Sequence, residues 1–110
     1  MAWRVVDCAM KIHPWDGYTE GWVYLAVLKD DKTGKELEFE LLDGVYYGEE
    51  EEDDENPWGL IEVIIDGALD FSEIFPEGER RKILRELKRR YGDIIDAINR
   101  ECDEFKLKLR

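Results

Sequence analysis

Two strand-forming segments joined by a short polar turn constrain the fold of this chain more than any other feature. Residues 21–29 (GWVYLAVLK) are apolar on both faces and rich in β-formers, which is typical of a central or covered strand. Residues 35–42 alternate between core-facing apolar and water-facing acidic side chains, and residues 30–34 suit a hairpin turn. The pattern predicts an antiparallel hairpin with one buried face. Its apolar positions are Leu37, Phe39 and Leu41, and its acidic positions are Glu36, Glu38 and Glu40.

Other segments extend this hairpin into a sheet. Residues 3–12 alternate and predict a first strand. We expect a bulge or turn at Asp43–Gly44, after which residues 45–47 resume the strand. The β-branched residues 60–66 predict a fourth strand that ends in an Asp-Gly turn, and residues 68–75 suit a short helical turn. The apolar face of the first strand holds Val6, Cys8, Met10 and Ile12.

The C-terminal region, residues 77–109, has the spacing of an amphipathic helix. Apolar side chains recur every three or four residues, and Glu77 and Glu79 lie near the positive end of the helix dipole. The unbroken phase favours one long helix, whereas Gly92 followed by Asp93 favours a break. A break also suits a small domain, because about 30 helical residues would span about 45 Å. We expect two helices. The apolar positions are Leu84, Leu87, Tyr91, Ile94 or Ile95, Ile98, Cys102, Phe105 and Leu109.

These segments together predict a single α+β domain over residues 1–110. A mainly antiparallel four-stranded sheet would carry the C-terminal helices on one face. An acidic loop, residues 48–57, would precede the last strand. A chain of 110 residues is long enough to bury a core without a disulfide or a metal ion.

The acidic loop contains seven consecutive carboxylates with no neutral residue between them. In an extended conformation they would carry about one negative charge per 3.3 Å, close to the phosphate spacing of about 3.4 Å in a DNA strand. A run of like charges is commonly a solvated segment. The functional alternative is an acidic surface offered to a basic partner. The acidic run consists of Glu49, Glu50, Glu51, Glu52, Asp53, Asp54 and Glu55.

The net charge of −12 is unevenly distributed along the chain. Residues 1–78 hold 5 Lys/Arg against 21 Asp/Glu, whereas residues 79–110 hold 11 Lys/Arg against 7 Asp/Glu. An acidic body argues against direct binding to nucleic acid or to an anionic membrane, and favours basic protein partners. No secretory signal and no apolar run long enough for a membrane helix is visible, so we expect a cytoplasmic protein.

Residues that could carry catalysis are few. His13 is the only histidine, and Asp16 and Tyr18 lie near it without forming a recognised catalytic motif. A histidine with no catalytic role is the commoner case, and we expect no enzymatic activity. Cys8 and Cys102 suit buried, unreactive thiols. No Cys/His cluster or phosphate-binding glycine pattern occurs, so we expect neither a metal ion nor another cofactor.

Aromatic residues in loops are candidate anchors for a partner. Trp15, Tyr18 and Trp58 fall in or beside predicted loops, and Trp and Tyr are enriched among residues that dominate binding energies. The alternative is that these rings cap a small sheet core. For Trp22 and Tyr24, which lie within a predicted strand, the core alternative fits better.

The helical region carries a basic surface around an apolar stripe of Ile83, Leu84, Leu87 and Tyr91. Its basic residues could contact a nucleic acid or a partner. A solvated helix face that offsets the acidic body is the simpler interpretation. The residues are Arg80, Arg81, Lys82, Arg85, Lys88, Arg89 and Arg90.

One segment resembles a pattern found in small uncharacterised phage-encoded proteins. Residues 63–76 (VIIDGALDFSEIFP) combine a strand, an Asp-Gly turn and the order Asp, apolar, Ser/Thr, acid, apolar ahead of a helix. The resemblance covers fourteen residues and brings no catalytic residue. It implies a viral accessory protein.

The leading hypothesis is a small acidic, non-enzymatic inhibitor that occupies the nucleic-acid site of a basic enzyme, such as a nuclease or a CRISPR effector. An immunity or antitoxin protein against a basic toxin would use the same physics. A structural or assembly module, whose acidic run is only a solvated loop, is the alternative from another class. The partner-binding residues would be the acidic run, Glu36, Glu38, Glu40, Trp15, Tyr18 and Trp58.

Overall fold

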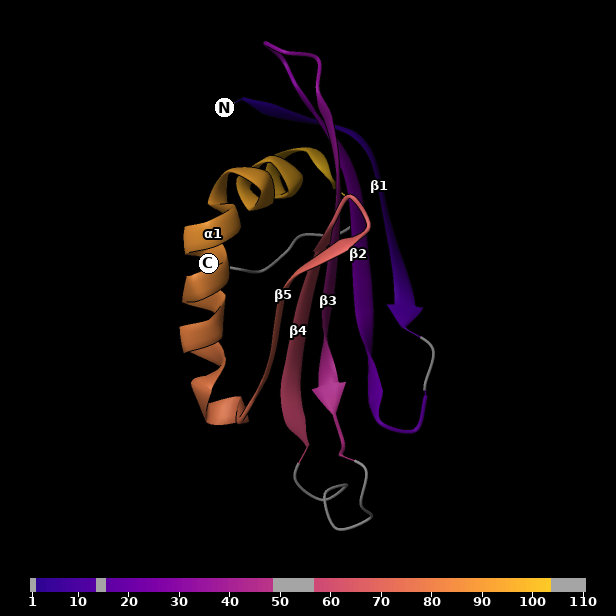
Figure 1. The fold of residues 1–110 in the computed structure, drawn as a ribbon, viewed down its shortest axis with the longest axis vertical. Coiled ribbons are helices and arrows are strands. Elements are labelled where there is room, and N and C mark those ends of the chain that lie inside the picture. The colour runs from indigo at the N-terminus through magenta and orange to yellow at the C-terminus, as the bar shows by residue number, and fades with distance from the viewer. Residues whose placement is uncertain (1, 14–15, 49–56, 104–110) are drawn as a thin grey trace.

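The computed structural model describes residues 2–13, 16–48 and 57–103. Five antiparallel strands lie in chain order in one sheet, and one C-terminal helix packs against one face of it (Figure 1). The predicted α+β class is confirmed, with five strands rather than four. The elements are β1 (Trp3–His13), β2 (Thr19–Asp30), β3 (Glu36–Tyr46), β4 (Trp58–Ile65), β5 (Ala68–Phe75), the 3-10 helix η2 (Glu77–Glu79) and α1 (Arg80–Glu101).

The β2–β3 hairpin forms as its sequence predicts. The Gly34 amide donates to the Asp30 carbonyl (2.9 Å), and Gly34 has a φ of 72°. The Asp30 carboxylate accepts a hydrogen bond from the Lys32 amide (2.8 Å), which orders the turn. β2 lies between β1 and β3, so the prediction of a central strand is confirmed.

Asp43 and Gly44 do not form the expected bulge or turn. They continue β3 in register, with Gly44 opposite Gly21 of β2 and Leu60 of β4. A Cβ atom on Gly44 would lie 2.2 Å from the carbonyl oxygen of Glu20. Glycine is required here for the close approach of two strands, a role that looks the same in sequence as a turn.

Residues 68–75, for which we expected a short helical turn, form strand β5. Asp66 and Gly67 have φ values of 50° and 83°, as in a two-residue type I′ hairpin turn. The Asp66 carboxylate accepts a hydrogen bond from the Glu38 amide (2.8 Å), which ties this turn to β3. Such a turn returns the chain beside the preceding strand, and the sheet therefore gains a fifth member.

The helical region is one bent helix rather than two helices. η2 occupies the expected start, and α1 then runs to Glu101. Tyr91, with φ −124° and ψ 19°, interrupts the regular geometry immediately before Gly92. The expected break is thus a kink that the helix continues through (Figure 1). Phe105 and Leu109 lie outside the described residues.

The hydrophobic core lies between α1 and one face of the sheet. Leu28 and Phe39 are fully buried in the same cluster as Leu87 and Ile98 of α1. The Tyr91 ring packs edge-on against Phe39, with ring centroids 5.9 Å apart. The inward face predicted for β3 is therefore confirmed.

β1 departs from the simple alternation of its sequence. Val6 forms a bulge that shifts the register against β2. Val5 and Cys8 pack against the core, but Val6, Met10 and Ile12 are 57%, 43% and 67% exposed. The predicted apolar face is only partly buried, and among the described residues the hydrogen bonds from α1 to β1 reach only Trp3 and Val5.

Candidate partner-binding face

The side of the sheet opposite α1 is covered by no described element, and we call it the open face (Figure 1). Its residues alternate with those of the core along each strand. Glu40 of β3 lies on it between Leu25 of β2 and Ile64 of β4. The open face therefore carries Glu36, Glu38 and Glu40, one of the two acidic segments identified in the sequence.

Four carboxylates form a row along β3 on the open face. The three glutamates predicted to face water occupy alternate positions of β3, about 6.6 Å apart. The fourth comes from β4, where Glu62 lies opposite Leu42, the next open-face position of β3. We call this set the acidic row, and it consists of Glu36, Glu38, Glu40 and Glu62.

The acidic row is not neutralised from within the described part of the chain. No lysine or arginine there forms an ion pair with any of its members. Lys29 of β2 lies opposite Glu36 but forms no ion pair with it. Glu62 accepts a long hydrogen bond from the Ser72 hydroxyl (3.4 Å). The row keeps its charge available to cationic groups from outside.

Aliphatic side chains flank the acidic row. Val23 and Leu60 are buried, but neither belongs to the core under α1. A hollow of about 250 Å³ lies between β1, β2, β3 and β4 on the open face. This surface offers both apolar contact and negative charge to a partner. The hollow is lined by Lys11, His13, Val23, Glu40, Leu42, Glu62 and Ile64.

His13 lines this hollow together with Glu40 and Glu62, and no hydrogen bond joins its Nδ1 to a described carboxylate. Its Nδ1 is buried and has no hydrogen-bond partner among the described residues. Asp16 instead accepts hydrogen bonds from the amides of Thr19 (2.7 Å) and Tyr18 (2.8 Å). The bond from the Thr19 amide, followed by that from Tyr18, holds the pKa of the Asp16 carboxyl below its ordinary value. The Asp16 carboxylate thus orders the loop.

No group of three or more His, Cys, Asp or Glu side chains able to hold a metal ion occurs in the described ranges. The acidic row does not provide such a group, because its members are spread along a strand at about 6.6 Å intervals. Ligands of one cation must converge within about 2.5 Å of it.

Two of the three candidate aromatic anchors lie at one end of the sheet. Consecutive strands are antiparallel, so the β1–β2 and β3–β4 connections emerge at the same end (Figure 1). Tyr18 is 46% exposed and Trp58 is 43% exposed. The Tyr47 amide donates to the Tyr18 carbonyl (2.7 Å) and joins the two connections. Trp15 and the acidic run, residues 49–55, belong to these connections but lie outside the described residues.

The acidic row and the point where the acidic run leaves the sheet are separated along β3. Glu36 begins the strand and Tyr46 ends it, about 33 Å apart at 3.3 Å per residue. We call the end of the sheet from which the β1–β2 and β3–β4 connections emerge the loop end. Glu62 is the member of the acidic row nearest to it. The acidic row therefore runs along β3 towards the loop end but does not form one continuous patch with it.

Trp22 does not take the core position that its strand location suggested. It is 44% exposed and lines a hollow of about 390 Å³ on the helix side of the sheet, near Asp43 and Arg80. Tyr24 does pack against the core, as expected.

Several basic residues of α1 are engaged within the protein. Glu86 accepts hydrogen bonds from Arg89 (2.6 Å) and Arg90 (2.7 Å). These bonds, led by that from Arg89, lower the pKa of the Glu86 carboxyl to about 2. Arg90 also lies over the ring of Phe71, 5.3 Å from its centroid. These contacts support the simpler interpretation of a solvated helix face.

Glu62 is the candidate residue that sequence reasoning missed. It is the single charged residue of β4, between Ile61 and Val63. The signal was present, because a lone charge in a buried strand marks the side that faces away from the core. Alternation with the core-facing Ile61 and Val63 would have assigned it to that side.

Comparison of the chain with protein-family models, curated proteins and solved structures gives no match. Among the described residues, no helix combines the length and the apolar character needed to cross a membrane.

Proposed function

We propose that this protein is a small acidic inhibitor that binds, without catalysis, to the nucleic-acid site of a basic enzyme. The observation that carries the proposal is the acidic row, four carboxylates that form no ion pair with any described residue, on a sheet face that no described element covers. Nucleic-acid sites use Lys and Arg to contact phosphates. Carboxylates spaced at about 6.6 Å along β3 could form ion pairs with several of these Lys and Arg side chains at once. The acidic run would extend the same charge beyond the sheet.

The open face also offers contacts that charge alone does not provide. Long-range attraction mainly raises the rate of association, whereas buried apolar and aromatic contacts slow dissociation. Leu42 and Ile64 line the hollow beside the acidic row, and Tyr18 and Trp58 are exposed at the loop end. We assign steering to the carboxylates and retention to these side chains. Trp15 remains a candidate for the same role.

An immunity or antitoxin protein against a basic toxin would use the same face. It differs from the leading proposal in the identity of the target, which would be a toxin made by the same cell. A structural or assembly module would instead hold its partner by apolar contact. The three functions therefore separate by partner identity and by the effect of salt.

The test is affinity capture from cells that contain the native partner, at about 50 mM and about 500 mM salt. We expect a basic nucleic-acid-binding enzyme that is retained at low salt and released at high salt, because ionic contacts are screened. Glu36→Gln/Glu38→Gln/Glu40→Gln/Glu62→Gln should capture much less of it. The association rate should fall about tenfold or more, since steering depends on summed charge.

A matched control removes four exposed carboxylates from outside the open face. Glu73→Gln/Glu79→Gln/Asp93→Asn/Asp96→Asn lowers the net charge equally and should capture nearly as much partner as the wild type. Equal loss in both variants would show that only total charge matters and would contradict the proposed face. A structural subunit retained at high salt by all three proteins would favour the assembly alternative.

A further inference from the structure

No described element covers the outer edge of β1 along most of its length. β1 is the first strand of the sheet and pairs with β2 alone. An edge strand presents backbone N–H and C=O groups that can pair with another chain, and proteins usually cover or interrupt such edges. An uncovered edge of this kind is therefore a candidate site for association with another chain.

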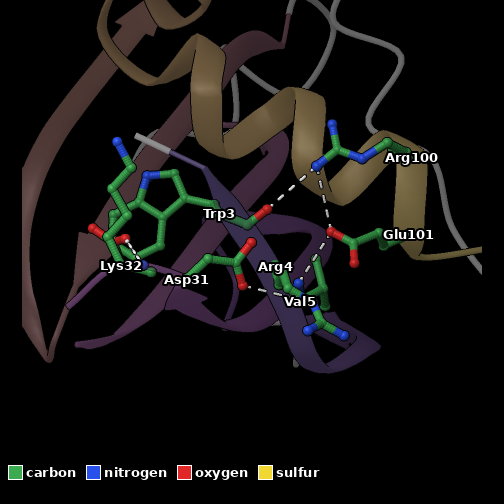
Figure 2. Close-up of polar contacts among 8 residues, drawn as sticks. Trp3, Arg4, Val5, Asp31, Lys32, Arg100 and Glu101 are labelled. Carbon is green, nitrogen blue, oxygen red and sulfur yellow. Dashed lines mark hydrogen bonds and ion pairs between the residues drawn. The ribbon is translucent and has the colours of Figure 1, made fainter. Parts of the chain in front are cut away.

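The end of α1 closes the first residues of the edge. The Val5 amide donates a hydrogen bond to Oε2 of Glu101 (3.2 Å), and Arg100 donates one to the Trp3 carbonyl (3.3 Å). Figure 2 shows both side chains reaching from α1 to the strand. Beyond Val5, the described part of the chain supplies no further partner for the outer edge. The unpaired segment is residues 6–13.

The side chains of this segment form two exposed rows. Met10 and Ile12 make an exposed apolar row on the helix side, and the bulged residue Val6 is exposed as well. Asp7, Ala9 and Lys11 alternate on the open face and are exposed as well. One edge thus combines unpaired backbone, apolar surface and one charge of each sign.

We propose that residues 6–12 of β1 pair antiparallel with the same segment of a second copy of this chain, with the two-fold axis at Ala9. Two sheets would then join into one, with both helices on the same side. Asp7 of each copy would lie opposite Lys11 of the other, and opposite charges in directly facing positions stabilise a strand pair. On the helix side, Cys8 would face Met10, and the bulged residue Val6 would lie opposite Ile12.

The charges select this register over its neighbours. Registers shifted by two residues also keep the helices on one side of the sheet. They place Asp7 opposite Ala9 or His13, and Lys11 opposite Val5 or Ala9. Opposite charges meet in neither of these registers. The axis at Ala9 also lies close to the middle of the unpaired segment.

Local charge on β1 permits two acidic chains to approach. The chain has a net charge of −12, but β1 carries Arg4 and Lys11 against Asp7 alone. The acidic row lies on β3 and β4, across β2 from this edge. The contact is short and flanked by a bulge, so we expect weak association, with a dissociation constant of roughly 10–100 μM.

Charge exchange tests the register in sedimentation experiments on the full chain. Asp7→Lys and Lys11→Asp should each weaken dimerisation about tenfold, because like charges then face each other twice per dimer. An equimolar mixture of the two variants should restore wild-type affinity, because each charge in the mixed dimer again faces its opposite. Asp96→Lys and Lys82→Asp, exposed changes on α1, should leave dimerisation nearly unchanged. A wild-type chain that stays monomeric at about 0.5 mM, or a mixture that remains monomeric, would overturn the proposal.

A cross-link tests the position of the axis independently. Ala9→Cys should form a disulfide-linked dimer joined at position 9 in a glutathione redox buffer, since the two residues would face each other across the axis. Ser72→Cys on β5, at the opposite edge of the sheet, should remain monomeric. Equal cross-linking of both variants would overturn the proposed pairing even if a dimer is present.

Discussion

A guanidinium nitrogen of Arg80 lies 2.5 Å from Oδ1 of Asp43. Arg80 is the first residue of α1, and Asp43 lies on the helix side of β3. The two side chains are 30% and 28% exposed, so the pair is partly shielded from water. This contact fixes the start of the helix on the sheet and leaves the opposite face uncovered.

Removal of this contact should lower stability. Arg80→Ala and Asp43→Ala should each reduce the free energy of unfolding by about 1–2 kcal/mol, as expected for a charge-assisted hydrogen bond that is partly screened. A double-mutant cycle in urea should show that the double variant loses little more than either single variant. Fully additive losses would mean that the two side chains do not interact in solution.

The alternation of β3 can be tested by one substitution on each face. Phe39→Ala should reduce the free energy of unfolding by about 3–5 kcal/mol, because it leaves a cavity in the core. Phe39 is fully buried, whereas Glu38 is exposed on the open face. Glu38→Ala should change stability by less than about 0.5 kcal/mol. Similar losses at both positions in chemical denaturation would contradict the register of the strand.

Tyr91 should make stability depend on alkaline pH. Burial, followed by its hydrogen bond to the Asp70 carboxylate, raises the pKa of Tyr91 to about 12. The folded pKa lies above the unfolded value of about 10, so the contribution is complete below pH 10 and is lost as the pH rises towards 12. Wild-type stability should therefore fall by up to about 2 kcal/mol over this range.

Tyr91→Phe provides the comparison, because it removes the titrating hydroxyl and keeps the ring. Its urea midpoint should fall less than that of the wild type between pH 10 and 12, while other groups titrate equally in both proteins. Parallel pH profiles would show that Tyr91 does not carry the dependence.

The two cysteines should differ in reactivity. Burial, followed by the hydrogen bond with Cys8, raises the pKa of the Cys102 thiol to about 12. Because the thiolate is the reactive species, iodoacetamide at pH 8 should modify partly exposed Cys8 well before Cys102. Peptide mass spectrometry would identify the sites, with full modification of both residues in urea as the control. Equal rates in the folded protein would contradict the burial of Cys102.

The elements with strong local patterns were predictable from the sequence. The β2–β3 hairpin follows from the alternation around Phe39 and the turn at Gly34, and both features act within a few residues. The kink at Tyr91 was anticipated from Gly92, although not that the helix would continue through it. Such features need no knowledge of distant contacts.

The missed features depend on tertiary context or on signals that have two meanings. Asp66–Gly67 suits a turn before a helix as well as a hairpin turn. Residues 68–75 form a strand because they pair with β4. The exposure of Met10 and Ile12 depends on how far α1 reaches across the sheet. Glu62 joins the acidic row only through its register with Leu42, which no local pattern specifies.

Competition for a single site tests the central proposal most directly. The captured enzyme is first saturated with a fluorescent nucleic acid, and the protein is then added while anisotropy reports displacement. We expect complete displacement by the wild type, and at least about tenfold weaker displacement by the variant with Gln at positions 36, 38, 40 and 62. The control with Glu73, Glu79, Asp93 and Asp96 neutralised should displace like the wild type. A ternary complex in which enzyme, nucleic acid and this protein are bound together would contradict occupation of the nucleic-acid site.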